Sequence, residues 1–384
     1  MRFRSRGVAA SLMVLVMLVS GTMVAFSASA AHGPPVDAWT VALYVAVDNN
    51  LEAAWDQYSI PSLSDIPYSD EVNVVAMVDR LSTDGLEMLQ FTGGGYEVVA
   101  TYPEMNTGDG ITFSFFIDEV SAMFPSESLC VIPWDHGGSW RGFCADDSQG
   151  GLITMEEFST ALTDAGEHID VLAFDACVMA STEVVYEAAI TDMVDYIVAC
   201  EMYVPYDSFP YDLMLTPLTE NPDATSEELC TIMLDGWEAY YHRGRSLNLV
   251  SVDVSAIGDA LPTFQAWTAA LSDGLETYKA EYTAALDGSI SNTYVGYNVD
   301  LYDFCEQLLM VVSDQAIIDT TNAVMAVVDS AVLGLTTSGW AAEMHGLSIW
   351  WASSDYLKYL APYIDQVQFA TDADWGALQT AYLG

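Results

Sequence analysis

The sequence predicts an α/β fold in which a mainly parallel sheet is covered by helices on both faces. Apolar runs of strand length alternate with segments of helical spacing through the first half of the chain. Such alternation is typical of parallel sheets, because each crossover helix buries one face of the sheet. Apolar residues make up 52% of the 384 residues, which is enough for a large core.

The N-terminal 30 residues have the pattern of an export signal. Three arginines, an apolar stretch over about 7–26 and a small-residue end at Ser27-Ala28-Ser29-Ala30 are typical of secretory signals. The apolar stretch is also long enough to span a bilayer, so a retained N-terminal membrane anchor is the alternative. Residues 31–38, which include Gly33-Pro34-Pro35, are predicted to be a linker, and residues 39–384 a single domain. We expect the protein to be secreted or displayed at the cell surface.

The predicted strands are apolar, β-branched runs that end in polar or turn-forming residues. They span residues 39–47, 72–78, 129–134, 169–174, 196–199, 247–252 and 347–351. Residues 86–101 alternate around three consecutive glycines and are predicted to form a hairpin.

The predicted helices have apolar residues three or four apart, or a capping box at their start. They span residues 51–58, 112–124, 154–164, 225–241 and 301–312. Thr154 with Glu157, and Thr225 with Glu228, have the spacing of capping boxes. Apolar residues from 178 to 189 also have helical spacing, which predicts a strand-to-helix turn at Cys177.

The chain is strongly acidic, with 55 acidic and nine basic residues and a formal net charge of −46. Nucleic acid is excluded as a partner, because phosphate binding requires clustered lysine and arginine. The acidic residues are spread along the chain, which has only two lysines. This distribution indicates that the protein works in a salty or divalent-rich medium, where ions screen the repulsion between its carboxylates. Ordinary solubility of an exported protein is the alternative interpretation.

Six cysteines are far apart in the sequence and form no C-x-x-C motif. This spacing indicates neither a zinc motif nor a dense disulfide scaffold. Most of them are expected to be core residues.

His136 and Cys177 each follow a predicted strand. Functional groups gather at the carboxyl edge of an open α/β sheet, so neighbouring strands would place the two side chains together. A thiol beside an imidazole is the arrangement of a nucleophile and its base. Gly137 and Gly138 allow close approach of the backbone and expose N–H groups, which can stabilise an oxyanion. A helix N-terminus after Cys177 would lower the thiol pKa. The structural alternatives are a loop histidine and a buried cysteine.

Acidic residues accompany this pair. Asp175, two residues before Cys177, and Asp207, in a later loop, could select a basic substrate side chain, although turn formation is the alternative role of Asp175. Further acids lie near strand ends: Asp48, Asp79, Asp146, Asp147 and Glu201. Oxygen-rich clusters of this kind suit Ca²⁺, but the spacing matches no EF-hand loop, and a solvated surface is the alternative, so no metal-ligand set is assigned.

Three segments carry a family resemblance: residues 39–52 (WTVALYVAVDNNLE), 134–140 (WDHGGSW) and 174–179 (FDACVM). Residues 299–304 and 345–349 match more weakly. With the histidine segment before the cysteine segment, the chain resembles the clostripain-like cysteine peptidases, which share the caspase-type fold.

The resemblance implies a caspase-like three-layer αβα sandwich and a Cys–His dyad. Cys177 would attack the scissile carbonyl, His136 would transfer the protons, and the N–H groups of Gly137 and Cys177 would form the oxyanion hole. Cleavage after arginine or lysine would use Asp175 and Asp207. Some family members depend on calcium, and some cleave themselves after a basic residue between the two segments. This chain departs from the second pattern, because the only arginine or lysine in that interval, Arg141, lies very close to His136 in the sequence.

We therefore expect an exported cysteine endopeptidase that acts on proteins or peptides and cleaves after basic residues. The chemistry requires no cofactor, and Ca²⁺ is a candidate ion. A membrane is a partner only if the N-terminal segment is retained. The competing hypothesis is a catalytically inactive acidic surface protein of the same fold that binds peptides or calcium.

Overall fold

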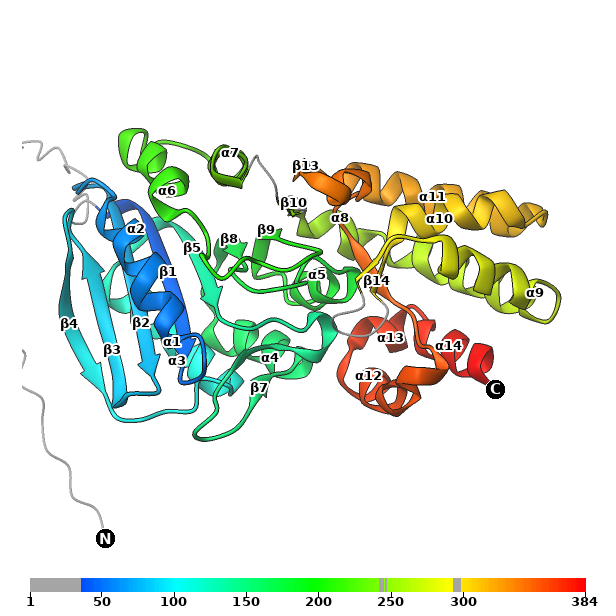
Figure 1. Cartoon of the computed structure of the whole chain (residues 1–384), viewed down its shortest axis with the longest axis horizontal. Helices are drawn as coiled ribbons and strands as arrows, with labels where there is room; N and C mark the ends of the chain where they lie inside the picture. Colours follow the sequence, from blue (N-terminus) through cyan, green and yellow to red (C-terminus); the bar gives the residue numbers. More distant parts are fainter. Residues whose placement is uncertain (1–35, 242–244, 246, 293–297) are drawn as a thin grey trace, which may run out of the picture. The chain divides into compact units, whose positions relative to one another are not determined.

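The computed structural model describes residues 36–384 apart from 242–244, 246 and 293–297 (Figure 1). The predicted signal at 1–30 lies outside the described residues. Strand β1 begins at Asp37, two residues before the predicted start of the first strand. Among the helices in the described ranges, none combines the length and apolar character needed to cross a bilayer.

The centre of the fold is a nine-stranded sheet. In spatial order its strands are β13 (Val332–Thr337), β10 (Asn248–Asp253), β9 (Val194–Ala199), β8 (Ile169–Ala173), β5 (Ser126–Trp134), β1 (Asp37–Val47), β2 (Val72–Arg80), β3 (Thr83–Phe91) and β4 (Tyr96–Tyr102). The five strands from β9 to β2 are parallel, whereas two antiparallel strands extend each edge. The predicted hairpin is β3 and β4, and the mainly parallel sheet is confirmed.

Helices cover both faces of this sheet because its central strands are apolar on both sides. Along β1, Ala42 and Tyr44 enter one core, whereas Leu43 and Val45 enter the other. The first core is closed by α3 (Gly110–Met123), α4 (Met155–Ala165), α5 (Thr182–Ala189) and α8 (Val254–Asp259). The second is closed by α1 (Glu52–Ala54), a π-helical turn (Trp55–Ser59), α2 (Ile60–Ser64), α6 (Tyr211–Glu220) and α7 (Ser226–Tyr241). The three-layer sandwich is confirmed.

Both predicted capping boxes form. The Thr154 hydroxyl accepts from the Glu157 backbone N–H, and the Glu157 carboxylate accepts from the Thr154 N–H, so α4 starts at Met155. Thr225 and Glu228 make the same reciprocal pair at the start of α7. Each box satisfies two N–H groups that have no partner within the helix.

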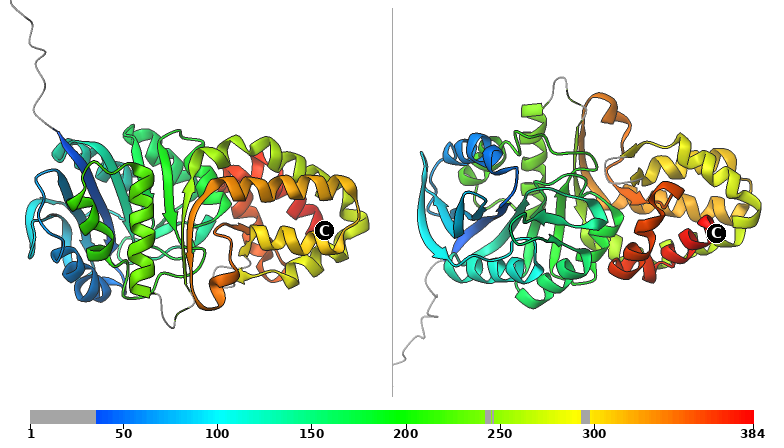
Figure 2. Two further views of the ribbon diagram at one scale, coloured as in Figure 1. Left: turned by 90° about the horizontal axis from the view of Figure 1, so that it is seen from above. Right: turned by 60° about the horizontal axis from the view of Figure 1, so that its bottom comes forward.

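A helical region extends beyond the β13 edge of the sheet (Figures 1 and 2). It contains α9 (Leu261–Gly288), α10 (Leu301–Val311), α11 (Gln315–Ala331), α12 (Leu360–Gln366), α13 (Gln368–Asp372) and α14 (Trp375–Leu383). Helices α9, α10 and α11 pack against one another. The Trp267 and Trp375 rings stack at 5.1 Å between centroids, which joins α9 to α14.

Two small sheets complete the fold. One pairs β6 (Phe143–Ala145) with β7 (Leu152–Ile153), and the other contains β11 (Ser291–Asn292), β12 (Asn298–Asp300) and β14 (Ser348–Trp350). The predicted strand at 347–351 is therefore β14, outside the large sheet. The Ser348 N–H donates to the Ala180 carbonyl at 3.0 Å, so β14 supports the segment that follows Cys177.

Candidate active site

His136 and Cys177 follow neighbouring parallel strands at the same edge of the sheet. Strands β5 and β8 pair in parallel, and a further bridge joins Trp134 to Asp175. The Asp175 N–H donates to the Pro133 carbonyl at 3.0 Å, which fixes this register. Each candidate residue lies two positions beyond a bridged residue. The pairing therefore places them in adjacent turns, as predicted from the strand ends.

The turn that carries Cys177 is held by the neighbouring strand end. Val178 has a φ of 58°, a strained conformation for a β-branched residue. Its N–H donates to the Met202 carbonyl at 2.7 Å, and the Ala180 N–H donates to the Cys200 carbonyl at 3.0 Å. These bonds keep the thiol at the sheet edge in a defined position.

The predicted helix after Cys177 forms, but it does not start directly at the Cys177 turn. Helix α5 begins at Thr182, with Ser181 as its N-cap, and Val178 and Met179 are buried in the turn instead. Residues 184, 185, 188 and 189 of the apolar spacing lie in α5, and only Val178 and Met179 belong to the turn. No helix N-terminus therefore acts on the thiol.

A cavity of about 460 Å³ joins the two candidate residues. Its walls are mostly apolar and aromatic, with two carboxylates among them. The lining residues are Leu51, Ala54, Trp134, Asp135, His136, Asp175, Cys177, Tyr203, Val204, Pro205, Tyr206 and Ser208. Five of them belong to the loop between β9 and α6.

The His136 imidazole is half-buried, and its Nε2 lies 3.0 Å from the Asn50 side-chain oxygen. This contact occupies one ring nitrogen and leaves Nδ1 for proton transfer. Burial lowers the pKa of His136 below its usual value, against the opposing charge of Asp147. The imidazole is therefore mostly neutral at neutral pH, as a general base requires.

The residue before His136 is held from two sides. The buried Asp135 carboxylate accepts from the Asn49 amide at 2.8 Å and from the Ala145 backbone N–H. The Asn49 amide also donates to the Ala145 carbonyl at 2.8 Å. The loop after β1 and the end of β6 together position the His136 turn.

The Cys177 thiol is the only partly exposed one of six unpaired cysteines. It lies 3.8 Å from the Val204 carbonyl oxygen, to which it donates. Burial raises the pKa of Cys177 to about 11. The predicted lowering of this pKa is therefore wrong for the free protein, because desolvation acts without an opposing helix terminus.

Two backbone donors lie beside the thiol. Within the described residues, no acceptor is bonded to the N–H of Gly137 or of Cys177. A Cβ atom at residue 137 would lie 2.2 Å from the Cys177 carbonyl oxygen and 2.9 Å from its nitrogen. Only glycine allows this approach of the two turns. Paired free N–H groups next to a nucleophile have the chemistry of an oxyanion hole.

Asp175 is buried beneath the cavity. Its Oδ2 accepts from the Ser208 hydroxyl at 2.5 Å, the Phe209 N–H at 3.1 Å and the Tyr211 hydroxyl at 2.5 Å. Burial raises the pKa of Asp175 to about 6, although these bonds oppose the shift. None of the described residues donates to Oδ1. The carboxylate therefore anchors the loop through Oδ2.

Asp207 does not line the cavity, although its neighbours Tyr206 and Ser208 do. Its carboxylate lies 2.6 Å from the Arg245 guanidinium. The structure therefore shows that Asp207 binds a guanidinium group, here one from the same chain.

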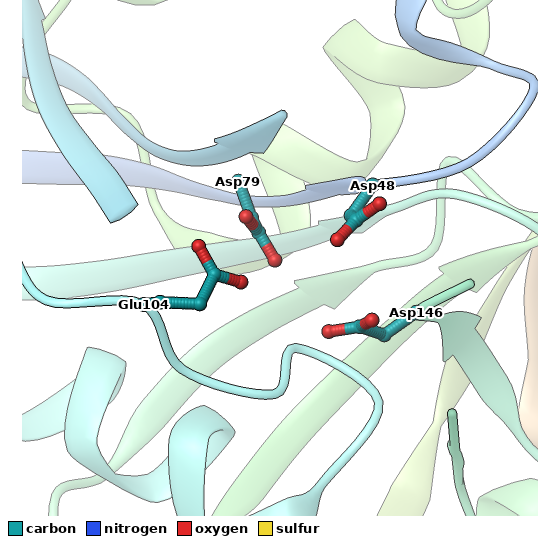
Figure 3. A group of neighbouring side chains, drawn as sticks. All are labelled: Asp48, Asp79, Glu104 and Asp146. Atoms are coloured by element: carbon teal, nitrogen blue, oxygen red, sulfur yellow. The ribbon is translucent and has the colours of Figure 1, made fainter. Parts of the chain in front are cut away.

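Four carboxylates cluster behind the His136 turn: Asp48, Asp79, Glu104 and Asp146 (Figure 3). Three of them were predicted from strand ends. Glu104 was missed, because it lies in the loop after β4, far from any predicted strand end of the site. The predicted Asp147 and Glu201 lie outside the cluster, and Glu201 instead accepts from the Asn248 amide at 3.0 Å.

Two residues that contact the dyad, Asn50 and Val204, were also missed. Both lie in loops, and no motif in the sequence marks them as contacts.

Comparison with known proteins agrees with this geometry. The model of the Clostripain family matches residues 43–375. Clostripain of Hathewaya histolytica is 24% identical in an alignment 234 residues long, which covers 50% of this chain and 44% of that protein. The chain thus aligns with less than half the length of this curated relative.

Solved structures show the same fold. An inactive zymogen C11 protease from Parabacteroides distasonis has a TM-score of 0.70 at 18% identity, over 89% of this chain and 99% of its own. A secreted C11 cysteine protease from Bacteroides thetaiotaomicron, bound to an irreversible peptide inhibitor, has a TM-score of 0.67 at 18% identity, over 88% and 99%. The expected fold is confirmed. Since the family model covers most of the chain, the protein belongs to the clostripain family.

Proposed function

We propose that the protein is an exported cysteine endopeptidase with a His136–Cys177 dyad that cleaves after arginine or lysine. The observation that carries the proposal is the strand pairing through Trp134 and Asp175. It brings an imidazole and a thiol to one cavity, and it brings the backbone of Gly137 against that of Cys177. Family membership supports the same reaction class.

In the proposed reaction, Nδ1 of His136 takes the thiol proton as the Cys177 sulfur bonds to the scissile carbonyl carbon. The N–H groups of Gly137 and Cys177 stabilise the resulting oxyanion. The imidazolium then protonates the leaving amine, which departs and leaves a thioester. Neutral His136 next removes a proton from water as the water oxygen bonds to the acyl carbon. The C–S bond then breaks, and the imidazolium returns its proton to the Cys177 sulfur. Apart from the substrate and one water molecule, every group in these steps belongs to the chain.

The free protein holds both dyad partners neutral. Within the described residues, no hydrogen bond joins the His136 ring to the Cys177 thiol, and burial disfavours the charged form of each. We infer that substrate binding brings the sulfur from the Val204 carbonyl to the imidazole. Thiol labelling of the free protein is then a poor test of catalysis, and turnover is the decisive one.

Asp175 supports the preference for a basic residue at the cleavage site. The cavity has apolar walls for the side-chain stem and buried carboxylates for its charge. A charge-assisted bond to a carboxylate in such a site favours a basic side chain by roughly 1.5–3 kcal/mol. The role of Asp207 as a second acid that selects a basic side chain stays a prediction, since a substrate would have to displace Arg245 from its carboxylate.

The test is turnover of fluorogenic peptides that differ only in arginine, lysine or leucine before the cleaved bond. Cys177→Ala should abolish cleavage, whereas Cys230→Ala, at a buried cysteine of α7, should leave it unchanged. Asp175→Asn should lower kcat/KM for the basic peptides by about 10- to 100-fold and spare the leucine peptide. Turnover that survives Cys177→Ala would refute the dyad. A folded protein that binds these peptides without cleaving them would instead establish the inactive surface protein.

A further inference from the structure

The two turns that carry the dyad are not hydrogen-bonded to each other. The pairing between β5 and β8 ends at the bridge between Trp134 and Asp175. Beyond this bridge, no hydrogen bond in the described part of the chain joins residues 136–142 to residues 176–181. The distance between the base and the nucleophile therefore depends on contacts that each turn makes elsewhere.

The turn that carries His136 packs against the C-terminal part of the chain through Trp140. This residue lies in a 3₁₀ turn (Ser139–Arg141) and is 2% exposed. Its ring is 5.2 Å from that of Trp350 in β14 and 5.1 Å from that of Tyr363 in α12, between centroids. The contact with Tyr363 is edge-to-face, a favoured geometry of aromatic rings. Movement of these rings would displace the backbone that leads to His136.

The turn that carries Cys177 is bonded to the same C-terminal part of the chain. The Ser348 N–H donates to the Ala180 carbonyl at 3.0 Å, and the Thr182 hydroxyl donates to the Ser348 carbonyl at 3.0 Å. Ser348 and Ser181 also form a β-bridge. Strand β14 is therefore held in register against the segment that follows Cys177.

Glu183 connects the two sets of contacts. It lies in the first turn of α5 and is fully buried. Its Oε1 accepts from the Trp350 N–H at 2.8 Å and from the Tyr363 hydroxyl at 3.0 Å. These are the two residues whose rings contact Trp140. Burial raises the pKa of Glu183 to about 6, so the carboxyl group is mostly ionised at neutral pH and both bonds are charge-assisted.

We propose that Trp140 and Glu183 are positioning residues that hold the His136 turn at a fixed distance from the Cys177 turn. Neither side chain lines the cavity, so both act through other residues. The connection runs from α5 through Glu183 to β14 and α12, and from their rings to Trp140. It supplies the link that the pairing of β5 with β8 does not extend to the turns. Its effect on turnover rests on the proposed peptidase function.

The first test replaces Trp140 and measures kcat and KM on an arginine peptide. Trp140→Ala should lower kcat by about 10- to 100-fold and change KM by less than about threefold, because the dyad is misplaced while the binding groups remain. Trp140→Phe keeps an aromatic ring and loses an indole N–H that has no partner, so its kcat should lie within about threefold of the parent.

Trp39→Ala is the matched control for Trp140→Ala. Trp39 is also 2% exposed, but it lies near the amino end of β1, away from the dyad. The loss of a large buried ring should lower the unfolding midpoint of both variants. Only Trp140→Ala should lose kcat.

Glu183 and Tyr363 are tested in the same assay. Glu183→Ala should lower kcat by about tenfold or more, because two charge-assisted bonds are lost, whereas Glu183→Gln keeps an acceptor oxygen and should lower kcat less. Tyr363→Phe loses the hydroxyl and keeps the ring beside Trp140. It should remain folded and lower kcat by roughly three- to tenfold, since one of the two bonds to the carboxylate is removed.

The pKa of His136 is a readout that does not depend on turnover. It is measured by NMR titration of the imidazole signals, which His136→Gln assigns. Burial lowers this pKa, so a displaced turn that exposes the ring should raise it toward its ordinary value in Trp140→Ala and leave it unchanged in Trp39→Ala. Asp147, whose charge raises the same pKa, is present in every variant.

Parental kcat in a folded Trp140→Ala or Glu183→Ala protein would overturn the proposal. If either variant does not fold, parental kcat and an unchanged His136 pKa in Tyr363→Phe would do so. An equal loss of kcat in the Trp39→Ala control counts equally against it, because the effect would then be a general loss of stability.

The two readouts separate this proposal from the proposed function. A parent protein without turnover, in which Trp140→Ala still shifts the His136 pKa, would refute the peptidase and leave the positioning role intact. An active parent in which Trp140→Ala changes neither kcat nor the His136 pKa would do the reverse.

Discussion

Replacement of Gly137 by alanine tests the closest contact of the proposed active site. The added methyl carbon would lie 2.2 Å from the Cys177 carbonyl oxygen and 3.1 Å from the Ala176 Cβ atom. Carbon and oxygen atoms that touch without repulsion are about 3.3 Å apart. The turns of residues 137 and 177 must therefore separate by about 1 Å.

This displacement separates the base and one oxyanion donor from the nucleophile. A misplacement of about 1 Å costs roughly 100-fold in rate, which corresponds to about 2.7 kcal/mol of transition-state stabilisation. Overpacking would also lower the free energy of unfolding by about 1–3 kcal/mol. We expect Gly137→Ala to remain folded at 25 °C and to lose activity mainly in kcat.

The assay is kcat and KM on an arginine peptide, together with the thermal unfolding midpoint. Gly288→Ala is the matched control, because its methyl group would meet only the flexible Gln307 side chain, at 3.1 Å. Near-parental kcat in a folded Gly137→Ala protein would show that the turns are not in the contact described. The reasoning about both the oxyanion hole and the dyad would then fail.

Two further predictions concern the dyad itself. Asn50→Ala should lower kcat by about tenfold with little change in KM, because the imidazole loses the partner of Nε2 and its fixed orientation. Asn322→Ala, at an exposed asparagine of α11, is its control, and equal kcat in the two variants would exclude the positioning role. Alkylation of Cys177 by iodoacetamide in the free protein should be slow at neutral pH and rise with pH toward a pKa of about 11, since only the thiolate reacts. A rate that is already maximal at pH 7 would mean that a thiolate–imidazolium pair exists before substrate binds.

Much of the fold follows from patterns that are local in sequence. The apolar run at 39–47 becomes β1, which is buried on both faces, because alternate residues of a strand enter opposite cores. Both capping boxes start helices where predicted, since four consecutive residues contain the whole interaction. The His136 and Cys177 strand ends were predictable for the same reason.

Other features depend on partners far away in sequence. Val178 and Met179 have helical spacing but lie in a buried turn, because the Met202 carbonyl and β14 hold that segment. The 3.6-residue period cannot distinguish a helix from a turn that packs on both sides. Asp207 lies at the right position in sequence but faces Arg245, which only the packing of the loop reveals.

The sequence by itself determined the layered α/β architecture, the family and the two strand ends that His136 and Cys177 follow. These depend on periodicity, on caps and on short segments whose residues act on their neighbours. Tertiary structure alone decided the electrostatics of the site. Burial places the Cys177 pKa near 11 and the Asp175 pKa near 6, and the folded loops bring Glu104 to three distant aspartates. Desolvation and charge interactions depend on distances in space, and the spacing of residues along the chain does not specify these distances.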